Sequence, residues 1–244
     1  MAIKRFLELS ERAFKMGEYA YTGFLNAEEQ GALYAVRKSL ASAYSLFGGT
    51  QDCERKMARF GSAALSGYDE AFPIVCLKIK RPSGAKTPLA HRDVLGAILA
   101  LGIERATIGD IAAKGSEAYV FCAESMADFI ITNLFRAGKE AVSCTVSAGL
   151  PEGPLYTPLE QRLQIASERA DAIVAKAYAL SREDSAALFE KEKVFVNAAP
   201  CPSGSRTLRA GDTVSVRGYG RFDYLGVAGT SKKGKLNVVI SKYA

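Results

Sequence analysis

The chain has 244 residues, of which 48% are hydrophobic, and it carries 32 Lys and Arg against 26 Asp and Glu, a formal net charge of +6. This length and apolar content predict two or three globular domains and exclude a largely disordered chain. The longest apolar run, residues 94–103, is about half of what a bilayer crossing requires. We therefore expect a cytoplasmic protein that does not bind membranes.

The five cysteines point away from metal and disulfide chemistry. They are odd in number and widely spaced, no C-x-x-C pair occurs, and the chain has one histidine. Zinc sites need four Cys or His ligands at short spacings. The sequence thus predicts reduced, buried thiols and neither a metal site nor a cofactor. The positions are Cys53, Cys76, Cys122, Cys144 and Cys201.

The first 72 residues have the hydrophobic spacing of helices. Apolar residues recur at intervals of three and four over 3–20 and 27–47, which predicts two helices. Asn26 is expected to cap the second helix, with Glu28 and Glu29 in its first turn. The glycine pair at 48–49 is expected to end it. We expect an N-terminal helical domain over residues 1–72.

A different order of elements follows in residues 73–150. The pattern strand–helix–strand–strand–helix–strand is typical of ferredoxin-like and RRM-like folds. The expected strands cover 74–80, 108–112, 118–123 and 141–147, and the expected helices cover 94–101 and 126–135.

Two aromatic residues on one of these strands raise the question of RNA stacking. Tyr119 and Phe121 share a strand face and could stack on bases. The RRM sequence motif, however, is matched only at Lys114, Gly115 and Phe121. We therefore favour a core or sheet-surface role for both aromatics.

Prolines and glycines in residues 147–158 predict a linker, and a third domain is expected over 157–244. Thr157 and Pro158 are expected to open one helix. Ser181 is expected to cap a second helix, with Asp184 at its positive end. Strands are expected over 194–197, 213–217 and 236–240, so this domain combines two helices with a small sheet.

The net charge is concentrated at the end of the chain. Residues 193–244 contain nine Lys or Arg against two Asp, a surplus of +7, whereas the preceding 192 residues carry 23 positive against 24 negative charges. A cationic field confined to a small segment favours a polyphosphate partner, because neutralised phosphates release counterions.

Several basic residues of the third domain are candidates for phosphate contacts. Arg169 and Lys176 are seven residues apart, which would place them within about 20° on one helix face. Arg182 at a helix start could bind a phosphate, although such arginines are commonly solvated or ion-paired surface groups. The twelve residues expected to contact RNA are Arg169, Lys176, Arg182, Lys193, Asn197, Arg206, Arg217, Tyr219, Arg221, Lys232, Lys233 and Lys235.

The C-terminal third resembles an S4 domain, a small RNA-binding module. The motif residues are Arg169-Ala170-Asp171, Ser181-Arg182, the strand 194–197 and Gly211-Asp212, with alanine at 170 in place of the usual leucine. Upstream, residues 23–30, 48–56 and 91–111 resemble the YlmH family of S4-domain RNA-binding proteins. Cys53 stands where that family tends to have alanine.

The YlmH resemblance implies an α+β protein with an N-terminal helical region, an RRM-like middle domain and a C-terminal S4 domain. It also implies a function in bacterial translation: binding of rRNA or tRNA, association with a large ribosomal subunit that carries a stalled peptidyl-tRNA, ribosome quality control, and links to cell division. No small-molecule substrate is expected.

Catalysis has no visible apparatus in the sequence. His91-Arg92-Asp93 matches three letters of a kinase catalytic loop, but the Asn required five residues after the Asp is replaced by Ile98. We therefore expect a protein that is not an enzyme. Two alternatives stay open: an S4-domain RNA-modifying enzyme of the pseudouridine synthase or methyltransferase type, and a division-site scaffold.

Overall fold

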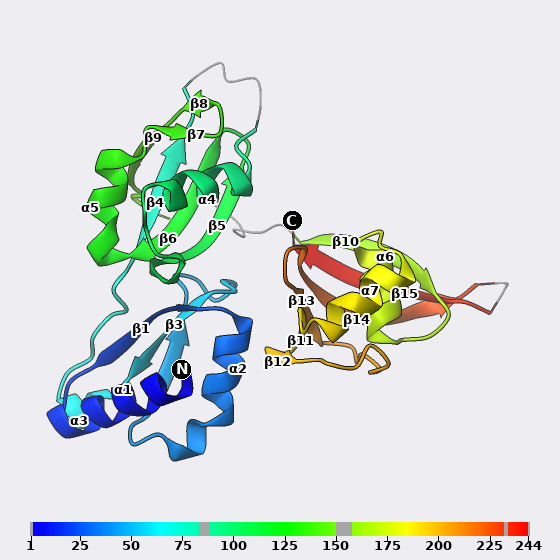
Figure 1. Cartoon of the computed structure of the whole chain (residues 1–244), viewed down its shortest axis with the longest axis horizontal. Coiled ribbons are helices and arrows are strands. Elements are labelled where there is room, and N and C mark those ends of the chain that lie inside the picture. The colour runs from blue at the N-terminus through cyan, green and yellow to red at the C-terminus, as the bar shows by residue number, and fades with distance from the viewer. Residues whose placement is uncertain (1, 83–87, 150–157, 232–233, 244) are drawn as a thin grey trace. The chain divides into compact units, whose positions relative to one another are not determined.

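The computed structural model describes residues 2–82, 88–149, 158–231 and 234–243 (Figure 1). The chain combines helices with antiparallel sheets, which confirms the predicted α+β class. The chain divides into two compact units, Met1–Leu155 and Tyr156–Ala244, called here the N-terminal unit and the C-terminal unit. In the described part of the chain, no helix has the length and apolar character that crossing a bilayer requires.

The N-terminal unit begins with a small three-stranded sheet and several helices. The prediction of a purely helical region is wrong, because three strands form an antiparallel sheet in the order β1-β3-β2. The helices are α1 (Ala2–Met16), α2 (Ala27–Ala35), η1 (Arg37–Ser39) and α3 (Ala63–Ser66), and the strands are β1 (Ala20–Leu25), β2 (Tyr44–Phe47) and β3 (Lys56–Phe60).

The start of α2 is as predicted, but its end is not. The Asn26 side chain accepts a hydrogen bond from the Glu29 amide at 3.0 Å, and the Glu29 carboxylate accepts one from the Asn26 amide at 2.8 Å. This reciprocal pair confirms the predicted cap. The helix ends at Ala35, well before the glycine pair. The apolar residues at 44–47 instead form β2, where Tyr44 lies opposite Phe60.

The middle of the chain has the predicted order of elements. The elements are β4 (Ile74–Lys80), α4 (His91–Ala100), η2 (Arg105–Thr107), β5 (Ile108–Lys114), β6 (Glu117–Ala123), α5 (Glu124–Asn133), a short hairpin of β7 (Arg136–Ala137) and β8 (Glu140–Ala141), and β9 (Ser143–Val146). The sheet order is β5-β6-β4-β9, and both longer helices lie on one side of it (Figure 1). Leu77, Val120 and Ile130 belong to the core between these layers.

Part of the opposite face of this sheet is covered by the preceding residues of the N-terminal unit. Phe121 and Tyr119 are 2% and 6% exposed, which confirms the expectation that both are packed rather than presented to solvent. Gly49 has φ of +109°, and a Cβ there would lie 2.1 Å from the Phe121 ring. Only glycine permits this close approach of the backbone to the ring.

A buried carboxylate also stabilises the contact between the middle sheet and the residues that precede it. The Asp110 carboxylate, on β5, accepts hydrogen bonds from the backbone amides of Glu54 at 2.6 Å and Arg55 at 2.9 Å. The Arg55 guanidinium in turn donates to the carbonyls of Ile108 and Phe24. The sequence segments 48–56 and 91–111 therefore meet at a hydrogen-bonded junction inside the N-terminal unit.

The C-terminal unit is a six-stranded sheet that shares one core with two helices. The elements are β10 (Leu159–Ile165), α6 (Ala170–Ala177), α7 (Arg182–Glu190), β11 (Val194–Val196), β12 (Ala199–Pro200), β13 (Thr213–Val216), β14 (Gly220–Thr230) and β15 (Leu236–Tyr243). The strand order is β10-β15-β14-β13-β11-β12. Ile173, Phe189 and Tyr224 belong to the shared core.

Two details of this unit differ from the sequence prediction. A helix does not follow Pro158; residues 159–165 form β10, which pairs with β15, whereas Thr157 lies outside the described residues. Leu163 and Ile165 are buried and alternate with exposed neighbours, which is the period of a strand. The helix α6 begins only at Ala170. The predicted Ser181 cap is confirmed, because its hydroxyl accepts a hydrogen bond from the Asp184 amide at 3.0 Å.

The five cysteines are reduced; Cys53, Cys122, Cys144 and Cys201 are buried and Cys76 is partly buried. Burial raises the pKa of Cys122 to about 12 and those of Cys76 and Cys144 to about 11. Because the thiolate is the reactive form, we expect these three thiols to react at pH 8 at least about 100-fold more slowly in the native protein than in denaturant. Mass spectrometry after timed iodoacetamide labelling measures this, and rapid native labelling of Cys122 would contradict it.

Candidate functional site

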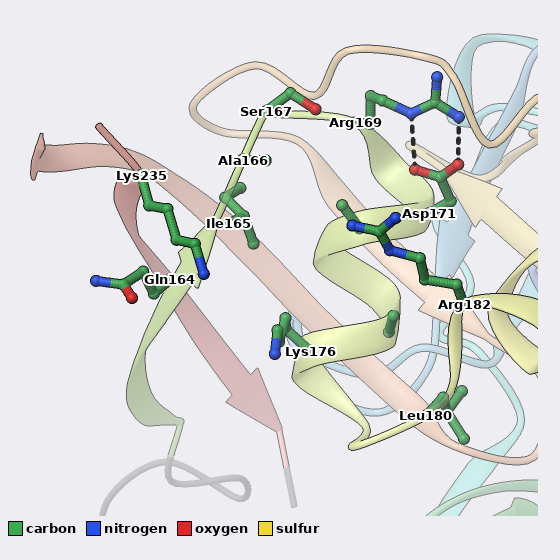
Figure 2. A pocket seen from close by; sticks show the side chains of 12 residues that line it. Gln164, Ile165, Ala166, Ser167, Arg169, Asp171, Lys176, Leu180, Arg182 and Lys235 are labelled. Atoms are coloured by element: carbon green, nitrogen blue, oxygen red, sulfur yellow. Dashed lines mark hydrogen bonds and ion pairs between the residues drawn. The ribbon is translucent and has the colours of Figure 1, made fainter. Parts of the chain in front are cut away.

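A basic groove of about 470 Å³ lies along α6 in the C-terminal unit (Figure 2). Four cationic side chains and one carboxylate line it, so its charge is positive. Its residues come from the end of β10, from α6, from the start of α7 and from the β14–β15 hairpin. They are Gln164, Ile165, Ala166, Ser167, Arg169, Asp171, Ala172, Ala175, Lys176, Leu180, Arg182 and Lys235.

The carboxylate in the basic groove is paired with one of the arginines. The Arg169 guanidinium donates two hydrogen bonds to the Asp171 carboxylate. This pair holds the pKa of Asp171 below its usual value and raises that of Arg169. The Arg169 side chain still has 49% of its surface exposed. One cation is thus held rigidly at the mouth of the groove, and its carboxylate partner is already neutralised.

The first amides of α6 are not available to an anion in the groove. The Ala170 amide donates to the Arg206 carbonyl at 2.8 Å, and the Asp171 amide donates to the Gly204 carbonyl at 3.0 Å. A helix N-terminus can bind anions only where its amides are unpaired. Recognition of an anion here therefore depends on the side chains. Arg206, also predicted to contact RNA, does not line the basic groove.

The three other cations reach the groove from separate elements. Lys176 lies in the last turn of α6, Arg182 is the first residue of α7, and Lys235 lies just before β15. Figure 2 shows Lys176 and Lys235 on opposite sides of the groove, and the Arg182 guanidinium beside Asp171. Cations spaced along a groove match a chain of phosphates better than one small anion.

The prediction that Arg169 and Lys176 share one helix face needs a correction. Arg169 is the N-cap of α6, with extended backbone angles (φ −68°, ψ 138°), and so lies outside the helix. Both residues nevertheless line the basic groove. The two residues are therefore neighbours in the groove, but not through the helical spacing on which the prediction was based.

Three other predicted residues lie together near the β13–β14 turn and contact the protein's own aromatic rings. The Arg217 guanidinium lies 5.3 Å from the Phe195 ring, and the Arg221 guanidinium 4.1 Å from the Tyr243 ring. The exposed Tyr219 ring lies 5.4 Å from another tyrosine ring, Tyr178. These residues do not line the basic groove; they form a separate cationic and aromatic cluster on the same unit.

Asn197 and Lys193 also lie outside the basic groove. The Asn197 amide nitrogen donates to Asp212 at 2.7 Å, and its oxygen accepts from the Thr213 amide at 2.9 Å. Its φ of 52° belongs to the two-residue turn between β11 and β12. The side chain therefore stabilises a turn. Lys193 is exposed before β11, and Lys232 and Lys233 lie outside the described residues.

Some residues of the groove were not predicted. Gln164 and Ser167 line it, and the sequence pattern indicates neither as a candidate. Asp171 was noted as part of the S4-like motif, but its ion pair with Arg169 follows from the extended cap and not from helical spacing. Among the described residues, no group of three or more His, Cys, Asp and Glu side chains is arranged to hold a metal ion.

Comparisons with known proteins match most of the chain. The model of a family described as "Putative RNA-binding domain in YlmH" matches residues 68–148. A curated relative, the "Ribosome-associated protein quality control protein P2" of Bacillus subtilis (strain 168), is 28% identical over 222 residues, which cover 91% of this chain and 86% of that protein. The solved structure titled "Cell division protein ylmH from Streptococcus pneumoniae" overlaps 60% of this chain and 88% of its own, with a TM-score of 0.49 and 20% identity.

Proposed function

Because the resemblance of this chain to the YlmH family is confirmed, we propose that it is a non-enzymatic, cytoplasmic RNA-binding protein that associates with the ribosome. The observation that carries this proposal is the basic groove, in which four cations from separate elements surround one already paired carboxylate. The name of the Bacillus subtilis relative supports the ribosomal setting.

In the proposed mechanism, the C-terminal unit is an S4 domain that binds folded RNA through phosphate contacts in the basic groove. Arg182 and Arg169 offer planar guanidinium groups that bind phosphate oxygens in pairs, and the two lysines act as point charges. The ligand is rRNA or tRNA on a large subunit with a stalled peptidyl-tRNA. The middle domain is RRM-like, and the role in translation is quality control, with cell division affected through it.

Salt dependence tests the electrostatic part of this proposal. For roughly six phosphate contacts we expect the logarithm of the association constant to fall with the logarithm of salt concentration with a slope of about −4 to −5. The measurement is a fluorescence titration of labelled tRNA with the full chain at several KCl concentrations. A slope near zero would mean that the cations face a different partner.

Co-sedimentation tests the ribosomal part. The full chain is mixed with purified large and small ribosomal subunits and separated on a sucrose gradient at low salt. We expect it to migrate with the large subunit, more completely when a peptidyl-tRNA is present. Migration at the top of the gradient under all conditions would instead favour a scaffold that acts apart from ribosomes.

A further inference from the structure

The N-terminal unit carries a second cationic surface, on the side of the middle sheet that the helices leave uncovered. Antiparallel partners point to the same side of a sheet. Lys114 lies opposite Glu117, which lies opposite Lys80. In the next row, Tyr119 lies opposite Lys78. We call these five residues the lysine face.

The lysine face is positively charged and held in place by its own carboxylate. The two Glu117 oxygens contact Lys78 at 2.9 Å and Lys80 at 3.6 Å. This pairing lowers the pKa of Glu117 and raises that of Lys78, so both are charged at neutral pH. The Lys80 side chain keeps 54% of its surface exposed. Three lysines against one glutamate leave a surplus of positive charge.

The lysine face offers cations but no aromatic platform. Phe121, one row further along the sheet, is covered by the backbone at Gly49. The Tyr119 ring is 6% exposed, and the Lys78 ammonium lies 5.6 Å from its centre. Base stacking requires an open ring face. The charge of the three lysines is therefore the feature of this surface that a ligand can recognise.

We propose that the lysine face is a second RNA contact that binds the phosphate backbone without reading bases, in addition to the basic groove. This inference rests on the proposed function. RNA is favoured over an acidic protein because the lysine face offers cations without an open aromatic or apolar side chain among its five residues, and because it lies within the region that matches the putative RNA-binding domain. Glu117 competes with phosphate for the same lysines, so it limits the affinity of this contact.

The test uses two substitutions with opposite expected effects in the full chain, measured with labelled tRNA at 50 mM KCl. We expect Lys80→Glu to weaken binding about three- to tenfold and to reduce the magnitude of the salt slope by about 1. We expect Glu117→Gln to tighten binding about two- to fivefold, because the competing charge is removed while the shape is kept. If Glu117 had only a structural role, Glu117→Gln would not raise the affinity for tRNA.

Lys139→Glu is the matched control, because it makes the same charge change at an exposed residue of the β7–β8 hairpin on the helix side of the sheet. We expect it to leave binding within about twofold of wild type. If Lys80→Glu and Glu117→Gln leave affinity unchanged while Arg182→Glu weakens it, the lysine face is overturned and the proposed function stands. If Lys80→Glu, Glu117→Gln and Arg182→Glu all leave tRNA binding unchanged, both proposals fail. If Lys80→Glu weakens binding and Arg182→Glu does not, the lysine face is supported as an RNA contact and the basic groove is not.

Discussion

Arg182→Glu is expected to weaken binding of tRNA and ribosomal subunits more than tenfold, which corresponds to at least about 1.4 kcal/mol. The change removes a guanidinium from the basic groove and puts a carboxylate beside Asp171, so phosphate meets repulsion in place of a paired hydrogen bond. The fold should be unaffected. Position 182 is exposed, and a carboxylate is favourable in the first turn of a helix.

The matched control for this prediction is Lys191→Glu. Lys191 is exposed at the other end of α7 and does not line the basic groove. We expect its reversal to change RNA affinity by less than about threefold, through the general field alone. Melting temperatures of both variants should stay close to wild type. Equal RNA binding by Arg182→Glu and wild type would remove Arg182 from the site.

Asp110→Ala is expected to lower the free energy of unfolding of the N-terminal unit by about 3 kcal/mol or more. Asp110 is 9% exposed, and its carboxylate accepts the backbone amides of Glu54 and Arg55. Its removal leaves two partly buried donors unpaired and takes an anion away from Arg55 and Arg105. Burial already lowers the pKa of Arg105 to about 10, so these cations are poorly solvated without it.

Urea unfolding followed by circular dichroism measures this loss, with Glu8→Ala as the control. Glu8 forms an exposed ion pair with Lys4 at 3.8 Å on α1, and such pairs contribute about 0.5 kcal/mol or less. Asp110→Asn should fall between the two, because its amide oxygen can accept one of the amides. A loss below about 1 kcal/mol for Asp110→Ala would show that the junction does not depend on this carboxylate.

The sequence predicted the middle of the chain well and the two ends less well. Residues 74–147 alternate apolar runs with turn glycines, so local pattern and tertiary structure agree there. In contrast, residues 44–47 have the spacing of a helix but form a strand. These residues pair with β3. A local sequence pattern does not show which distant strand a segment will pair with. The same holds for residues 159–165, which pair with β15 more than 70 positions away in the chain.

The candidate site shows which part of function a sequence can reveal. Charge and motif selected Arg169, Lys176, Arg182 and Lys235, and the fold brings all four to one groove. The sequence could not show that Arg217 and Arg221 pack on aromatic rings of their own unit. Nor could it show that the Asn197 side chain stabilises a turn through hydrogen bonds. These outcomes depend on long-range neighbours, which charge counting does not describe.

Ultraviolet crosslinking of the full chain to ribosome-bound RNA, followed by mass spectrometry of the crosslinked peptides, shows directly whether the basic groove contacts RNA. We expect crosslinks in peptides that contain the residues of the basic groove, above all Lys176, Arg182 and Lys235, and their loss in high salt. Crosslinks confined to α1, α2 and the β7–β8 hairpin, or none at all at low salt, would contradict this expectation.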